Sequence, residues 1–181
     1  MGVVISGSFS GGHLNPAVSV GLAMVGKFEW HKVPGYMLAQ LLGAIMGAFL
    51  TYLQYRGHFK QTSDAATKLG VFATAPAIPN IFNNFLSEVL GTFMLVFGVF
   101  YLIEGSDVGS LSALPVGLLV TVIGLSLGGS TGYAINPARD LGPRIFHALI
   151  INKDSNWKYA WIPVFAPILG AVLAALIFGL L

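Results

Sequence analysis

Two copies of the tripeptide Asn-Pro-Ala are the part of this 181-residue chain whose residue types and spacing could do chemistry. The first copy begins at Asn15 and the second at Asn136, and a glycine-containing segment precedes each. The asparagine side-chain oxygen can cap a helix, and Pro16 or Pro137 then occupies the first helical position, where the missing N–H costs nothing. The amide nitrogen still offers donors to a solute, which neither serine nor an ionised aspartate could match. Each copy therefore predicts a helix that begins at a hydrogen-bonding site.

The two helices predicted after these asparagines are too short to cross a membrane. They cover about residues 16–26 and 137–149, some ten to thirteen residues each, whereas a hydrocarbon core of ~30 Å takes about 20. A half-helix that begins at membrane depth exposes unpaired N–H groups and a positive dipole end, which requires a polar cavity or surrounding protein. Two such ends facing each other disfavour cations, so the sequence predicts a site for a neutral hydroxylic molecule. The preceding segments 11–14 and 132–135 are expected to be extended and to point successive carbonyls into that site.

The composition excludes most soluble classes of protein. Only 9% of the residues are charged and 55% are hydrophobic, with a mean hydropathy of +0.79, whereas soluble domains are about 25% charged. The chain is therefore expected to be an integral membrane protein. Its net charge of +2 comes from few groups without a basic cluster, which gives no support for nucleic-acid binding. We expect no enzyme, cofactor or metal site, since the sequence shows no phosphate-binding loop, nucleophile–base set or metal-ligand spacing.

The predicted elements form a single all-α membrane domain over residues 1–181. Four full spans are expected, over residues 33–55, 84–103, 111–127 and 157–181, with a turn at 104–107. The repeat extends beyond the tripeptides, because residues 39–48 align with residues 166–175 in the span that follows each half-helix. Three crossings separate the two units, and this odd number places the second unit upside down in the membrane. The domain then divides into the end of a first inverted repeat (1–55), a loop (56–81) and a second inverted repeat (82–181).

The segments around the two tripeptides resemble the two signature loops of the aquaporin family. Residues 11–18 read Gly-Gly-His-Leu-Asn-Pro-Ala-Val and residues 132–140 read Gly-Tyr-Ala-Ile-Asn-Pro-Ala-Arg-Asp, and the Arg139-Asp140 pair resembles the glycerol facilitator branch. The resemblance covers essentially the whole chain. It implies a right-handed helical bundle with two re-entrant half-helices in inverted repeats, assembled as a homotetramer in the plasma membrane. It also implies a passive channel for glycerol, small neutral polyols and water that excludes protons and ions.

The resemblance assigns residues to the pore. It implies that Asn15 and Asn136 meet at the pore centre and that Arg139, Gly124 and Tyr133 belong to the selectivity filter. Phenylalanine is usual at position 133 in glycerol facilitators, so Tyr133 adds a hydroxyl there. The complete set of residues expected to line the pore is Gly11, Gly12, His13, Leu14, Asn15, Gly124, Tyr133, Ala134, Ile135, Asn136 and Arg139.

A second set of residues is expected to support the pore loops. Glu88, an acid inside a predicted span, is expected to accept hydrogen bonds from unpaired N–H groups of a re-entrant loop. Gln40 is interpreted in the same way, His13 is expected to hold the first loop, and Asp140 to brace the second. The start of each half-helix completes the set, with Pro16, Ala17, Pro137 and Ala138.

Two alternative functions stay open. The solute could be another small neutral molecule, such as urea, lactic acid or hydrogen peroxide. The family has six spans and this chain begins at the end of the second, so the resemblance also admits a truncated, non-conducting subunit that associates with full-length partners. With the first span and most of the second absent, the wall of the pore in this chain is expected to be incomplete.

Overall fold

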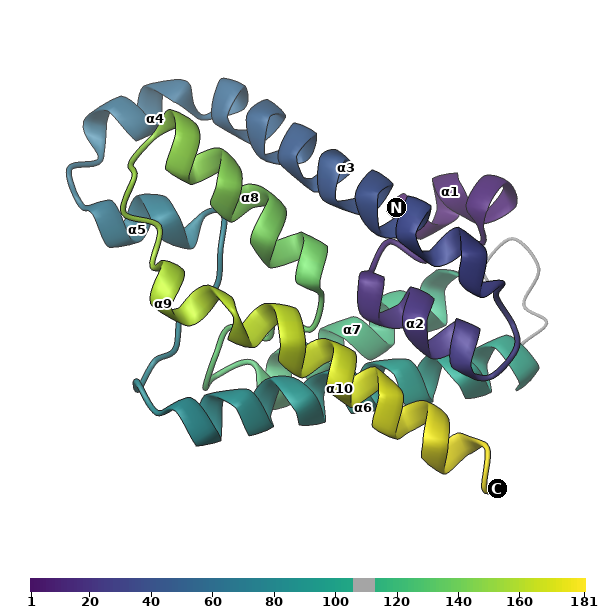
Figure 1. The fold of residues 1–181 in the computed structure, drawn as a ribbon. Coiled ribbons are helices and arrows are strands. Elements are labelled where there is room, and N and C mark those ends of the chain that lie inside the picture. The colour runs from purple at the N-terminus through teal and green to yellow at the C-terminus, as the bar shows by residue number, and fades with distance from the viewer. Residues whose placement is uncertain (106–112) are drawn as a thin grey trace.

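A computed structural model describes residues 1–105 and 113–181 of the chain (Figure 1). The described residues form helices and connecting segments and contain no strand. In chain order the helices are α1 (Gly2–Ser10), α2 (Pro16–Met24), the short 3-10 helix η1 (Trp30–Lys32), α3 (Val33–Gln54), α4 (Arg56–Gln61), α5 (Ala65–Gly70), α6 (Ile81–Gly105), α7 (Ala113–Leu127), α8 (Pro137–Ile150), α9 (Trp157–Ala160) and α10 (Ile162–Phe178). The predicted all-α fold is confirmed.

The half-helices α2 and α8 begin at the two prolines, as predicted. They contain 9 and 14 residues, so neither could cross a hydrocarbon core of ~30 Å. Asn15 and Asn136 are the N-cap residues, each with an extended backbone and a side-chain oxygen that accepts a hydrogen bond from the first turn. The ends of both helices lie within two residues of the expected ends, which is the usual uncertainty of a helix boundary.

Three helical stretches of the described residues are long and apolar enough to span a membrane, namely Trp30–Gln54, Ile81–Leu102 and Trp157–Phe178. The expected span at 111–127 corresponds to α7, which is shorter than a membrane span. Residues 111 and 112 of the expected span lie outside the described residues. The prediction of a turn at 104–107 is wrong for residues 104 and 105, which are helical, and residues 106 and 107 lie outside the described residues. The expected loop 56–81 contains the two short helices α4 and α5.

Each half-helix packs against the long helix of the other repeat unit. Helix α8 lies along α3 and α2 lies along α10, while α10 also packs along α6 (Figure 1). Glycine allows the closest of these approaches. A Cβ atom at Gly170 of α10 would lie 2.4 Å from the backbone oxygen of Val89, and one at Gly142 of α8 would lie 2.7 Å from the Cβ of Ala44. Because lipid is as apolar as these side chains, such close packing rather than a hydrophobic driving force stabilises the bundle.

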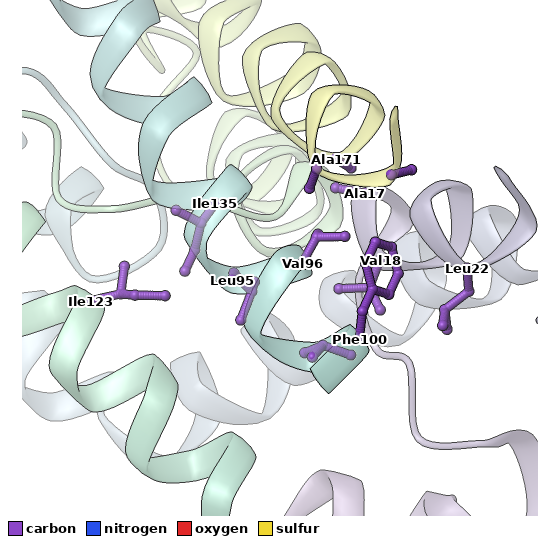
Figure 2. Close-up of a cluster of buried hydrophobic side chains, with 12 residues drawn as sticks. Ala17, Val18, Leu22, Leu95, Val96, Phe100, Ile123, Ile135 and Ala171 are labelled. Carbon is purple, nitrogen blue, oxygen red and sulfur yellow. The ribbon is translucent and has the colours of Figure 1, made fainter. Parts of the chain in front are cut away.

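The largest cluster of buried side chains joins α2, α6, α7 and α10 (Figure 2). Val18 of α2, Val96 and Phe100 of α6 and Ala171 of α10 contribute to it, together with Ile135 from the loop before α8. The cluster therefore connects the second glycine-containing loop to four helices.

Candidate functional site

The N-termini of α2 and α8 meet, and the two N-cap asparagines bind each other's loop. Asn15 donates from Nδ2 to the carbonyl oxygen of Ile135 at 2.8 Å, and Asn136 donates from Nδ2 to the carbonyl oxygen of Leu14 at 3.0 Å. Each side chain still caps its own helix, since Oδ1 of Asn15 accepts from the N–H of Ala17 at 2.9 Å. Oδ1 of Asn136 accepts from the two N–H groups that follow Pro137, at 3.0 and 3.1 Å.

These two hydrogen bonds between each asparagine and the opposite loop correct one detail of the prediction from sequence. Both N–H donors of each asparagine amide were expected to face a solute, but one donor of each is bound to the opposite loop. An amide nitrogen carries two hydrogens, so one donor on each side is left for a solute. A carbonyl oxygen has two lone pairs, so the carbonyls of Leu14 and Ile135 can each accept a second hydrogen bond, from a solute.

The backbone of the two loops also differs from the expected extended form. Gly11 and Gly12 have φ of 73°, Gly132 has φ of 78°, and the non-glycine residues Tyr133 and Ile135 have φ of 40° and 41°. A positive φ is a strained conformation for a β-branched residue such as isoleucine and costs of order 1–3 kcal/mol. Because these left-handed residues turn the loop backbone, the geometry of the loops depends on contacts that hold them in place.

Glu88 of α6 provides two of these contacts. Its fully buried carboxylate accepts a hydrogen bond from the N–H of Ala134 at 2.9 Å and another from the N–H of Ile135 at 2.7 Å. Ile135 is consequently held on both backbone polar atoms, by Glu88 at its nitrogen and by Asn15 at its oxygen.

His13 and Gln40 hold the first loop. Gln40 of α3 donates from Nε2 to the carbonyl oxygen of His13 at 2.6 Å and to Oγ of Ser19 at 2.9 Å. The His13 ring shares a 2.9 Å hydrogen bond with the same hydroxyl and stacks on Tyr36 at 4.7 Å between ring centroids. The first loop is therefore attached to α2 and α3, whereas the second is attached to α6.

A cavity of about 550 Å³ extends along the two loops. All the residues expected to line a pore border it except Gly124. Its remaining wall is largely apolar and comes mostly from α2, α6 and α7, with residues such as Val18, Leu95 and Val120. The cavity thus has a polar side, formed by loop backbone, the two asparagine amides and Arg139, and an apolar side.

Gly124 lies against the ring of Tyr133 and is not among the residues that border this cavity. A Cβ atom at Gly124 would lie 2.9 Å from Cζ of the Tyr133 ring, so the glycine makes room for the aromatic ring that does border the cavity. Arg139 is the third residue of α8, in its first turn, and its Nη1 donates to the carbonyl oxygen of Phe72 at 3.4 Å. Phe72 follows α5, in the segment expected to be a loop.

Two residues near the site were not identified from the sequence, Arg144 and Thr74. Arg144 is fully buried and pairs with Asp140, expected only as a brace, at 2.8 Å. The spacing of four residues between an acid and a base on one helix was the available signal. No sequence pattern indicated Thr74, because its contact with Asp140 joins residues that are 66 positions apart.

Comparisons with known proteins show which family and fold the chain is similar to. A sequence model of the family described as "Major intrinsic protein" matches residues 1–178. The chain is 56% identical to the glycerol uptake facilitator protein of Bacillus subtilis over 91% of the chain, and it spans 61% of the length of that relative. It is 51% identical to "Glycerol uptake facilitator protein 3" of Lactiplantibacillus plantarum, over 100% of the chain and 77% of the relative. The X-ray structure of the aquaglyceroporin from Plasmodium falciparum superposes with a TM-score of 0.88 at 33% identity, covering 97% of this chain and 75% of that one.

Proposed function

Because this chain belongs to the major intrinsic protein family, a family of membrane channels rather than enzymes, we propose that it is a passive channel for glycerol, small neutral polyols and water. The chain is an integral, multi-pass membrane protein. Two of the proteins it resembles, at 56% and 51% identity, are named glycerol uptake facilitators, which supports glycerol as the permeant. A homotetramer in the plasma membrane, implied by the resemblance in sequence, is part of the same proposal.

The observation that carries the proposal is the meeting of two helix N-termini at one cavity. The remaining amide donors of Asn15 and Asn136 face the same region as the carbonyls of Leu14 and Ile135, so a hydroxyl group finds both a donor and an acceptor there. The apolar wall on the other side suits the carbon backbone of a polyol. A cation meets two positive dipole ends and the Arg139 guanidinium instead, which supports exclusion of protons and metal ions.

Reconstitution into liposomes tests the proposal. Vesicles that contain the protein are expected to swell in an inward glycerol gradient faster than protein-free vesicles, without a proton leak detected by an entrapped pH dye. The same vesicles are then exposed to urea, lactic acid and hydrogen peroxide. Flux of one of these solutes without glycerol flux would favour the alternative channel, and equal swelling with and without protein would reject a conducting role.

A second candidate function is that of a subunit whose pore wall is completed by a neighbouring chain. It is favoured by the open face of α3. A Cβ atom at Gly43 or Gly47 meets nothing within 4 Å, whereas Gly170, which aligns with Gly43 in the internal repeat, packs tightly against α6. In addition, α1 has no buried residue. If flux per protein rises with the protein-to-lipid ratio, neighbouring chains complete the pore wall of one another. A flux per protein that stays constant favours a pore formed within one chain.

A further inference from the structure

A buried ion pair on α8 lies directly beside Arg139 in sequence. Asp140 and Arg144 are one helical turn apart, and both side chains are fully buried. Nε of Arg144 donates to Oδ1 of Asp140 at 2.8 Å, so the guanidinium and the carboxylate are held in a fixed mutual orientation.

One further polar atom of each partner binds Thr74, which lies in the connecting segment between α5 and α6. Oδ2 of Asp140 accepts from the N–H and from the hydroxyl of Thr74, both at 2.7 Å. Nη2 of Arg144 donates to the carbonyl oxygen of Thr74 at 2.8 Å. Thr74 is therefore bound at all three of its polar atoms, and we call Asp140 and Arg144 the Thr74 clamp.

The clamp is itself fixed from the opposite side. Nη1 of Arg144 donates to the carbonyl oxygen of Ser155 at 2.6 Å, in the connection between α8 and α9. The Ser155 hydroxyl is bound to the buried His147 ring at 2.7 Å. The position of Arg144 thus depends on two connections that approach α8 from different directions.

The clamped segment returns to the pore at Phe72. Phe72 lies two residues before Thr74, and its carbonyl oxygen accepts the hydrogen bond from Arg139. Arg139 and Asp140 are neighbours on α8, so the contacts form a closed circuit from Arg139 through Phe72, Thr74 and Asp140 back to Arg139. A shift of the segment would move an acceptor of the guanidinium that borders the cavity.

We infer that Thr74, Asp140 and Arg144 are positioning residues that place the Arg139 guanidinium and thereby set which neutral solutes pass. The inference rests on the proposed channel function and names a determinant of its selectivity. Stability alone explains the pair poorly, because a buried ion pair is often no more stabilising than packed apolar residues of similar volume.

The test replaces the Thr74 hydroxyl and measures a ratio of permeabilities. Thr74→Val keeps the shape and the backbone contacts of the residue but removes the hydroxyl that donates to Asp140. Because the ratio of erythritol to glycerol permeability does not depend on how many channels are inserted, a loss of folded protein leaves it unchanged. We expect Thr74→Val to change this ratio by roughly threefold or more. Thr74→Ser, which keeps a hydroxyl, should retain the wild-type ratio.

Two further variants keep the test decisive. Thr121→Val removes a hydroxyl that is exposed on α7 and bonds only within its own helix, to the carbonyl oxygen of Gly117 at 2.9 Å, so the ratio should not change. The double variant Asp140→Leu with Arg144→Met removes the clamp without leaving a buried charge unpaired, and it should change the ratio in the same direction as Thr74→Val. An unchanged ratio in both Thr74→Val and the double variant would overturn the inference.

Amide hydrogen exchange separates this inference from the proposed function, because it needs no transport. In the double variant, exchange in residues 71–77 should become faster than in the wild type, while residues 33–54 should be unaffected. If amide exchange in residues 71–77 is the same in the double variant and the wild type, Asp140 and Arg144 do not hold this segment, and the inference is overturned even when the channel conducts. Wild-type vesicles that pass neither glycerol nor erythritol would reject the proposed function, and the exchange result would then decide the clamp by itself.

Discussion

The carboxylate of Glu88 and the backbone N–H of Ile135 are joined by a 2.7 Å hydrogen bond that helps to hold a β-branched residue at a φ of 41°. The bond connects the first third of α6, the longest helix of the described residues, to the loop that precedes the second half-helix. A strained conformation persists only where its surroundings determine it, and here the surroundings are Glu88, Asn15 and the apolar cluster around the Ile135 side chain.

Glu88→Gln tests this attachment. The glutamine offers one oxygen and one NH₂ group where two loop N–H groups need acceptors, so one N–H loses its partner and faces another donor. We expect unfolding free energy to fall by about 1–3 kcal/mol and glycerol flux per protein to fall with it. Thermal unfolding in detergent and stopped-flow swelling provide the two measurements. Glu29→Gln, at an exposed position, should leave both within error, and equal effects of the two changes would contradict the attachment.

The strain at Ile135 can be measured by comparing two truncations of its side chain. Glycine adopts a φ of 41° without a steric penalty. In alanine, as in any other L-residue, this left-handed backbone costs of order 1–2 kcal/mol. Ile135→Gly should therefore be no more destabilising than Ile135→Ala, although it removes one more carbon from a buried site. If thermal unfolding shows Ile135→Ala to be clearly the more stable variant, the loop is not strained as described.

Asn136→Asp replaces a donor with an anion at the junction of the two loops. The bond to the carbonyl oxygen of Leu14 becomes a repulsion between two oxygens, and the negative charge lies between two positive dipole ends where cations are otherwise excluded. We expect glycerol flux to fall by about tenfold or more and a proton leak to appear. Asn83→Asp, the same change at the exposed start of α6, is the control. Unchanged flux without a leak in Asn136→Asp would place the pore elsewhere.

Gly124 and Tyr133 form a testable pair because a Cβ at Gly124 would overlap the tyrosine ring. Gly124→Ala is expected to push the ring towards the cavity and to lower glycerol flux more than water flux. Combining it with Tyr133→Leu should reverse that change, since the shorter side chain leaves room for the new methyl group. Gly117→Ala, on the same helix with nothing within 4 Å, should change neither flux. If the double variant keeps the low ratio of glycerol flux to water flux seen in Gly124→Ala, the two residues act independently.

Gly170 and Gly43 occupy aligned positions of the internal repeat but differ in their surroundings. Gly170→Ala would place a methyl group 2.4 Å from the backbone oxygen of Val89, which forces α10 and α6 apart and should destabilise the fold by about 1–3 kcal/mol. Gly43→Ala should be nearly neutral in dilute protein, because nothing lies near its Cβ. A large loss of stability in Gly43→Ala would show that another helix covers this face of α3, as the second candidate function requires.

The half-helices and the spans were predictable because their signals are local. An asparagine followed by proline defines a helix start within a few residues, and apolar runs define the long helices. Glu88 was predictable as an acceptor because an acid inside a span needs a polar partner. The sequence could not tell which N–H groups it binds, since Ala134 and Ile135 are 46 and 47 residues away.

The features that were missed depend on tertiary contacts. Positive φ is easily anticipated at Gly132, but not at Tyr133 or Ile135, where distant residues impose it. Arg144 was not distinguished from a basic residue at the membrane surface, because its burial follows from Thr74 and Ser155, which flank it from two separate connections. The bonds between each asparagine and the opposite loop likewise arise only when the two units come together.

Those bonds between the loops have a consequence for how the protein is made. Asn15 and its acceptor Ile135 are separated by 120 residues, and Asn136 and Leu14 by 122. At a synthesis rate of ~5–20 residues per second, the first loop leaves the ribosome roughly 6–24 s before its partner exists. During that interval its amide and carbonyl groups require water or other protein as partners, because lipid supplies none. The first half-helix can therefore reach its final hydrogen-bonding arrangement only after residue 136 has been synthesised.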